Sequence, residues 1–138
     1  MDWKLEVIVL PVTDVDRAKA FYGDRLGFRL DVDHSAGEAF RVVQMTPPGS
    51  ACSITFGVNV GGGEPGTTKG LHLVVDDIEA AHSHLEGAGV QNSGIRHFEE
   101  GRMADGPDPE RRDYGSYVFF DDPDGNSWAV QEVRHSVR

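Results

Sequence analysis

Two residues with acid–base or ligand-binding chemistry occupy alternating positions in short apolar runs. His72 lies in the run 71–75, and Tyr117 begins the run 117–121. An imidazole titrates near working pH, and both side chains can transfer a proton or hydrogen-bond to a ligand. Because successive side chains of a strand point to opposite faces, His72 is expected on the face away from the leucines beside it. His72 and Tyr117 are therefore the candidate catalytic or ligand-contacting residues.

The last apolar run supplies the neighbours of these two residues. It follows Asp122–Asn126, whose Asp-Pro-Asp-Gly-Asn sequence is a strong turn signal. A hairpin through that turn places Tyr117 opposite Gln131 and Phe119 opposite Ala129. An aromatic wall with a few polar groups is typical of a small-molecule pocket. The expected ligand-binding residues are His72, Tyr117, Phe119, Gln131, Thr55 and Arg102.

These candidates also have structural interpretations. His72 can be a hydrogen-bonded histidine that meets no ligand. Arg102, Arg111 and Arg112 fall in or near a segment rich in Gly and Pro, residues 93–114, and can be solvated on a mobile lid. Alternatively they clamp an anion, because a guanidinium binds carboxylate or phosphate in two-pronged fashion.

Composition limits the function classes. The chain has 138 residues, 38% hydrophobic and 26% charged, which is typical of one globular domain. Its net charge of −10 disfavours nucleic acid and anionic membranes as partners. Cys52 is the only cysteine, which excludes an intramolecular disulfide. With no signal-peptide pattern and no apolar run of membrane-spanning length, the sequence predicts a cytoplasmic protein.

The chain also contains an internal repeat. Val12–Ala18 matches Val75–Ala81 at a constant offset of 63 residues. In each half an alternating apolar run precedes the match and a helical pattern follows it, which predicts two copies of one supersecondary unit. Asp14 or Thr13 is the expected cap of the first helix, and Asp76 with Glu79 forms the expected capping box of the second.

The predicted organisation is a single domain, residues 1–138. Residues 4–60 form the first β-α-β-β-β module, 61–69 a Gly-rich linker, and 70–134 the second module. Within the second module, residues 93–114 are expected to form a long irregular loop and to be the most mobile part of the chain.

The order of several motifs resembles the vicinal oxygen chelate superfamily, which includes glyoxalase I, bleomycin-resistance proteins, fosfomycin-resistance transferases and extradiol dioxygenases. The resemblance rests on Leu10–Asp14 running into Ala20–Tyr22 and Leu26–Phe28, on Leu73–Ala81, and on Asp122–Asn126. It implies an α+β fold of two paired β-α-β-β-β modules, whose curled mixed sheets form an open cleft. It also implies a homodimer and a small molecule bound in the cleft, often beside a divalent metal.

The metal is not expected here. By the family's pattern, its ligands come from the first and last strands of each module. These positions hold Val7, Gly70 and Ala129, and either Ser53 or Thr55. A divalent ion needs several imidazole, carboxylate or thiolate donors. The resemblance therefore predicts the fold and the cleft without the usual metal or any other cofactor.

Three functions remain open. The favoured one is metal-free binding of a small organic molecule, as in the drug-sequestering branch of the family. The alternative is a glyoxalase-like lyase or isomerase, or a dioxygenase-like enzyme, with His72 or Tyr117 as acid–base group. The third is a regulatory or structural partner with a vestigial cleft. A displaced metal site at His72 and Gln131 is a less favoured variant, because Gln is a poor ligand.

Overall fold

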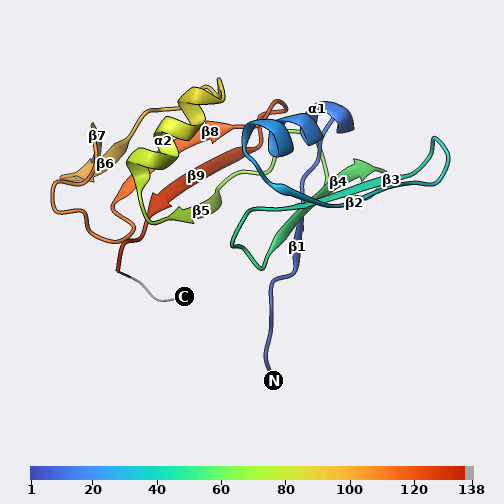
Figure 1. Cartoon of the computed structure of the whole chain (residues 1–138), viewed down its shortest axis with the longest axis horizontal. Coiled ribbons are helices and arrows are strands. Elements are labelled where there is room, and N and C mark those ends of the chain that lie inside the picture. Colours follow the sequence, from blue (N-terminus) through green and yellow to red (C-terminus); the bar gives the residue numbers. More distant parts are fainter. Residues whose placement is uncertain (136–138) are drawn as a thin grey trace. The chain divides into compact units, whose positions relative to one another are not determined.

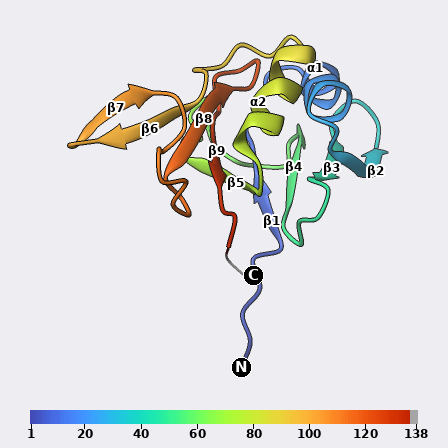
Figure 2. The ribbon, with the colours of Figure 1, turned by 60° about the vertical axis from the view of Figure 1, so that its left-hand side comes forward.

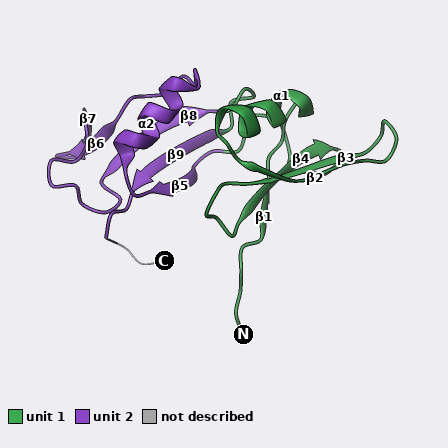
Figure 3. Ribbon diagram, in the orientation of Figure 1, with its two compact units in different colours: residues 1–68, 122–126 green, residues 69–121, 127–138 purple. Residues whose placement is uncertain are grey.

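The chain divides into two compact units, which Figure 3 shows in separate colours. The computed structural model describes residues 1–135. Unit 1 contains Met1–Thr68 together with Asp122–Asn126, and unit 2 contains Lys69–Asp121 and the chain from Ser127 onward. Unit 1 has the element order of a β-α-β-β-β module and unit 2 has the same order with one added strand, so the predicted α+β class and the predicted repeat are confirmed.

Unit 1 is built on one mixed sheet with the strand order β1-β4-β3-β2. The first strand runs parallel to the last, and the other neighbours are antiparallel. Its elements are β1 (Val7–Val9), α1 (Val15–Ala20), the π-helical turn η1 (Phe21–Arg25), β2 (Arg29–Ser35), β3 (Arg41–Thr46) and β4 (Ser53–Val58) (Figure 1).

The helical segment of unit 1 starts as predicted and then widens. Asp14 caps α1 by accepting a hydrogen bond from the amide of Arg17 at 3.0 Å. After Ala20 the segment becomes a π-turn, in which the amide of Leu26 bonds to the carbonyl of Phe21 at 3.1 Å. Gly27 ends the segment with a φ of +80°, as its position predicted.

Unit 2 repeats this topology with one extra strand at its edge. The sheet has the order β5-β9-β8-β6-β7, and the first strand again runs parallel to the last. Its elements are β5 (Leu71–Val75), α2 (Ile78–Gly87), β6 (Arg96–Glu99), β7 (Arg102–Asp105), β8 (Ser116–Asp121) and β9 (Ser127–Glu132).

Helix α2 covers one face of the unit 2 sheet. It packs on β8 and β9, where Val118 and Val130 are buried. Its cap is Asp77, whose carboxylate accepts the amides of Glu79 and Ala80, and not the predicted Asp76. The capping box is therefore wrong by one residue, because Asp77 holds the extended conformation that a cap requires.

The expected irregular loop is wrong for part of residues 93–114. These residues contain β6 and β7, which project as a hairpin in Figure 2. Glu100 and Gly101 form its two-residue turn with φ of +51° and +79°, the conformation of a type I′ connection. A Glu-Gly pair is a weak sequence signal for such a turn, so the charges and glycines of this segment predict an irregular loop where the structure has a hairpin.

The turn between β8 and β9 belongs to unit 1, although both strands belong to unit 2. Asp122 accepts hydrogen bonds from Asn126 and from the Tyr22 hydroxyl, the latter at 2.7 Å. Asn126 donates to the carbonyl of Pro11 at 3.0 Å. Asp124 accepts from Thr13. The clustered carboxylates of this turn are thus structural, as the turn interpretation predicted.

No helix among residues 1–135 is both long enough and apolar enough to cross a membrane.

Candidate functional site

The face of the unit 2 sheet opposite α2 carries the predicted residues. The predicted register is confirmed, since Tyr117 lies opposite Gln131 and Phe119 opposite Ala129. In the parallel pair of β5 and β9, His72 is the neighbour of Ala129. We call this surface the open face; it comprises His72, Val74, Arg96, Phe98, Tyr117, Phe119, Ala129 and Gln131.

His72 is held by a side chain of the same face. Its Nδ1 lies 2.6 Å from Oε1 of Gln131. Because the amide oxygen can only accept, Nδ1 must carry the hydrogen, and Nε2 of the neutral ring presents a lone pair. His72 is exposed, while Gln131 is nearly buried in the central strand. The arrangement fixes the orientation of the imidazole and offers a ligand an acceptor.

An aromatic cluster lies beside this pair. The rings of Tyr117 and Phe119 stack with centroids 5.6 Å apart and an interplanar angle of 13°. Phe98, from the hairpin, meets Tyr117 edge-on at 5.6 Å and is 54% exposed. Aromatic pairs in these arrangements are favourable, and their free ring surfaces can take up another flat ring. The open face is therefore an aromatic platform with polar groups at its margin.

Arg96 provides a positive charge at that margin. It lies opposite Tyr117 in the pairing of β6 with β8, so its side chain emerges on the open face. Its Nη1 is 3.5 Å from Asp105, a weak ion pair with an exposed carboxylate. Its Nε is buried and has no hydrogen-bond partner among the described residues, so the donors open to a ligand are those of the two terminal nitrogens. A guanidinium with donors to spare suits an anionic or carbonyl group of a ligand.

Sequence reasoning missed Phe98 and Arg96. Both lie on β6, in the segment interpreted as a loop, so no strand alternation was available to place them. Their one sequence signal was the alternation of Arg96 and Phe98 with His97 and Glu99 before the Glu-Gly turn.

Two predicted binding residues lie away from the open face. Thr55 is in β4 of unit 1, and its hydroxyl donates to the carbonyl of Val43 at 2.9 Å. Arg102 is in β7 opposite Glu99, which puts it on the other face of the hairpin from Phe98. The structure does not bring either residue to the platform within unit 2, and their contact with a ligand stays a prediction.

The other two loop arginines are paired with carboxylates of this chain, and their roles in a mobile lid or an anion clamp stay predictions. Arg111 binds the buried carboxylate of Glu132 through two nitrogens, at 2.9 and 2.6 Å, and Glu79 at 3.0 Å. Arg112 binds Asp108 in the same two-pronged manner. These carboxylates occupy part of each guanidinium, and the Arg112 side chain is still 66% exposed.

The carboxylate of Glu132 also binds the start of α2. It accepts the amide of Ile78, the first residue of the helix, at 2.9 Å. The hydrogen bonds from Arg111 lower the pKa of Glu132, burial raises it, and the bond from Ile78 lowers it further, with a net lowering. Glu132 thus fixes the helix that backs the open face.

The positions that would hold a metal in the family do not suit one. Val7 and Ala129 end in methyl groups, and Gly70 has no side chain. Glu132, the nearest carboxylate on β9, faces α2 and is occupied by Arg111. Among residues 1–135 no three His, Cys, Asp or Glu side chains gather in a way that could hold a metal ion. The donor set does not fit a divalent ion.

Comparison with known proteins identifies the family. The profile of the Glyoxalase/Bleomycin resistance protein/Dioxygenase superfamily matches residues 4–130. The chain belongs to this superfamily. One relative, the uncharacterized protein YetH of Bacillus subtilis (strain 168), is 21% identical over 130 residues, covering 94% of this chain and 98% of YetH.

Several solved structures superpose well on this one. TnmS3, an antibiotic binding protein from Streptomyces sp. CB03234, gives a TM-score of 0.73 at 28% identity, covering 96% of this chain and 97% of TnmS3. A glyoxalase/bleomycin resistance protein from the same strain gives a TM-score of 0.70 at 29% identity, covering 94% and 100%. The chain is similar to proteins that share its module order over almost their whole length.

Proposed function

We propose that this protein binds a planar aromatic small molecule on the open face of unit 2 and holds it without transforming it. The observation that carries the proposal is the exposed aromatic cluster of Phe98, Tyr117 and Phe119 on a face whose opposite side is closed by α2. A flat ligand ring stacked there would remove apolar ring surface from water on both partners.

The polar groups at the margin of the open face would fix the orientation of the bound ligand. Arg96 suits a carboxylate, sulfonate or carbonyl group, and Nε2 of His72 suits a hydroxyl donor. Ala129, between His72 and Phe119, adds only a methyl group to the open face. Likeness to TnmS3, an antibiotic binding protein, supports a sequestering role for this chain.

Metal-free binding is part of the proposal, and it rests on the unsuitable donors at Val7, Gly70 and Ala129. The cleft formed by both modules, the homodimer and the cytoplasmic location stay predictions. So does the alternative of an enzyme that uses His72 or Tyr117 as acid–base group.

The test uses anilinonaphthalene sulfonate, a fluorescent probe with flat rings and one anionic group. Wild-type protein should bind it saturably with one site per chain. Phe119→Ala should weaken binding several-fold. Tyr114→Ala is the matched control, because Tyr114 is as exposed as Phe119, 38% against 37%, and lies outside the open face. Equal loss in both variants, or none in Phe119→Ala, would contradict the proposal.

A second probe separates binding from catalysis. Quercetin is flat, carries hydroxyl donors and is open to oxidation. The protein should bind it and return it unchanged in mass, with no oxygen consumed. A new product that disappears in His72→Ala would favour the enzyme alternative.

A further inference from the structure

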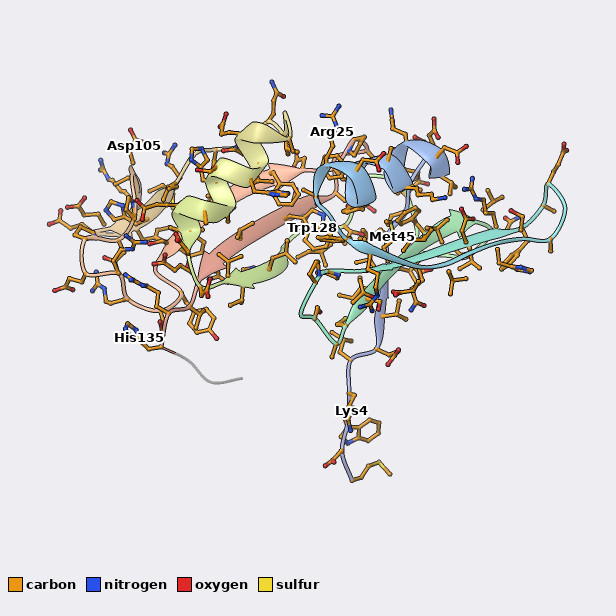
Figure 4. The ribbon with its side chains drawn as sticks, viewed as in Figure 1. Lys4, Arg25, Met45, Asp105, Trp128 and His135 are labelled. Carbon is orange, nitrogen blue, oxygen red and sulfur yellow. The ribbon has the colours of Figure 1, made fainter. Side chains whose placement is uncertain are left out.

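The sheet of unit 2 has one strand more than that of unit 1, and the added strand brings a carboxylate to the margin of the open face. This strand is β7, which pairs with β6 at the edge of the sheet. Its last residue is Asp105, which Figure 4 labels, and the residue opposite Asp105 in β6 is Arg96. Because residues directly opposite each other on two strands project on the same side, the Asp105 carboxylate lies beside the Arg96 guanidinium.

This carboxylate holds the guanidinium only loosely. Nη1 of Arg96 lies 3.5 Å from Oδ1 of Asp105, beyond the roughly 2.7–2.9 Å of a charge-assisted hydrogen bond. The Asp105 side chain is 94% exposed, so water competes with Arg96 for it. Arg111, by contrast, donates to the buried carboxylate of Glu132 at 2.9 and 2.6 Å. Asp105 is therefore a counter-ion that another anion can replace.

Part of the Arg96 guanidinium is removed from water without a compensating contact. Its Nε is buried and has no hydrogen-bond partner among the described residues, and 34% of the side chain is exposed. Burying a charged group costs free energy unless the group is paired, and a pair with an exposed carboxylate returns little of that cost. An anion at the two terminal nitrogens would offset the cost. A neutral acceptor would offset less, because it adds no opposite charge.

We propose that the open face selects planar aromatic acids and that Asp105 is the residue that determines this specificity. The ring stacks on Tyr117 and Phe119, and the acid group takes the place of Asp105 on Arg96. Arg96 faces Tyr117 from the neighbouring strand, so an acid group attached directly to the stacked ring can reach the guanidinium. A neutral ligand competes poorly with the Asp105 carboxylate. This inference rests on the proposed function, and it adds the charge of the ligand and the residue that selects it.

The test compares two flat probes of the same size, 2-naphthoate and its neutral amide 2-naphthamide, by NMR titration of the full chain. Wild type should bind the naphthoate more tightly. Arg96→Met should weaken naphthoate binding about fivefold and leave naphthamide binding nearly unchanged. Asp105→Asn should tighten naphthoate binding about threefold, because the acid group no longer competes with a carboxylate, and should affect the naphthamide less.

A double variant separates an effect through Arg96 from a change in net charge. If Asp105 acts through Arg96, the gain from Asp105→Asn should largely disappear in Arg96→Met/Asp105→Asn. Glu100→Gln is the matched control, because Glu100 is an exposed carboxylate in the turn of the same hairpin and lies outside the open face. It should leave the Kd of both probes nearly unchanged.

Two results would overturn the inference. One is equal affinity of wild type for the two probes, and the other is a gain in Asp105→Asn that is as large for the naphthamide as for the naphthoate. In either case, weaker binding of both probes by Phe119→Ala would leave the proposed stacking site intact. If neither probe binds, the inference and the proposed function fail together.

Discussion

Tyr117 and Phe119 show how a single residue can affect binding without affecting the fold. Their rings stack on the open face, while Val118 between them is completely buried under α2. We expect Tyr117→Ala to weaken binding of the sulfonate probe by about 1–3 kcal/mol, or roughly 5- to 150-fold. Val118→Ala should leave affinity nearly unchanged and lower the free energy of unfolding by about 1–3 kcal/mol.

Probe titrations and urea unfolding of the two variants check this pair of outcomes. If Tyr117→Ala unfolds as easily as Val118→Ala and binds like wild type, the two faces of β8 have been assigned the wrong way round.

His72 gives a second prediction at this scale. Its contact with Gln131 requires the neutral ring to carry hydrogen on Nδ1. Nitrogen NMR of labelled protein above neutral pH should show that tautomer, and Gln131→Leu should shift the population toward hydrogen on Nε2. A wild-type ring already protonated on Nε2 would contradict the geometry.

At the scale of elements, Glu132 links β9, Arg111 and the first turn of α2. Its lowered pKa means that its ionised form stabilises the folded state above its ordinary value of 4.5, and that this stabilisation is lost as pH falls from there toward the lowered pKa. Glu132→Gln should cost about 3 kcal/mol at neutral pH, because it leaves a part-buried guanidinium without its main partner. The free energy of unfolding of this variant should also fall less steeply than that of wild type as the pH is lowered.

Urea unfolding over an acid-to-neutral pH series measures both effects. Glu79→Gln is the control, because Glu79 is the exposed partner of Arg111, and it should change stability by no more than about 1 kcal/mol. Equal losses in the two variants would show that the buried contact has no special weight.

The segment 93–114 is where sequence and structure differ most. The high mobility expected for it stays a prediction, which the hairpin makes more specific. Amides at the Glu100–Gly101 turn should exchange fastest, whereas that of Asp108 should exchange slowly because it donates to the Ser116 hydroxyl at 2.9 Å inside a buried turn. Hydrogen exchange resolved by peptide would settle it, and uniform exchange across the segment would count against this division.

Strong local patterns explain why most elements were predictable. The run 71–75 is a strand with those bounds, and the run 117–121 is the strand Ser116–Asp121, one residue longer at its start. The register that places Tyr117 opposite Gln131 followed from the Asp-Pro-Asp-Gly-Asn turn, whose residue types strongly favour a hairpin connection. Arg96 and Phe98 could not be placed, because their strand is short, charged and closed by an uncommon turn. The pairing of Arg111 with Glu132 spans 21 residues and leaves no local signal.

At the scale of the whole molecule, the absence of suitable ligands gives a test that needs no activity. Protein purified and dialysed without chelator should carry no stoichiometric zinc, nickel, iron or manganese, since Val7, Gly70 and Ala129 cannot donate. Elemental analysis measures this directly. About one ion per chain that survives dialysis would restore the metal-dependent alternative.

The turn Asp122–Asn126 makes the chain less divisible than its internal repeat suggests. Because these residues belong to unit 1, the polypeptide passes between the units at three places, after Thr68, after Asp121 and after Asn126. A protease that nicks the Gly61–Gly66 stretch would separate residues 1–60 from the rest of the chain covalently, but the hydrogen bonds of Tyr22, Pro11 and Thr13 to the turn would still join the two fragments. Recombination with a relative that replaced residues 1–60 alone would separate matched residues. The new equivalents of Tyr22 and Pro11 would contact a turn that comes from the original chain. An exchange that keeps unit 1 intact must therefore transfer residues 1–68 together with the five residues Asp122–Asn126.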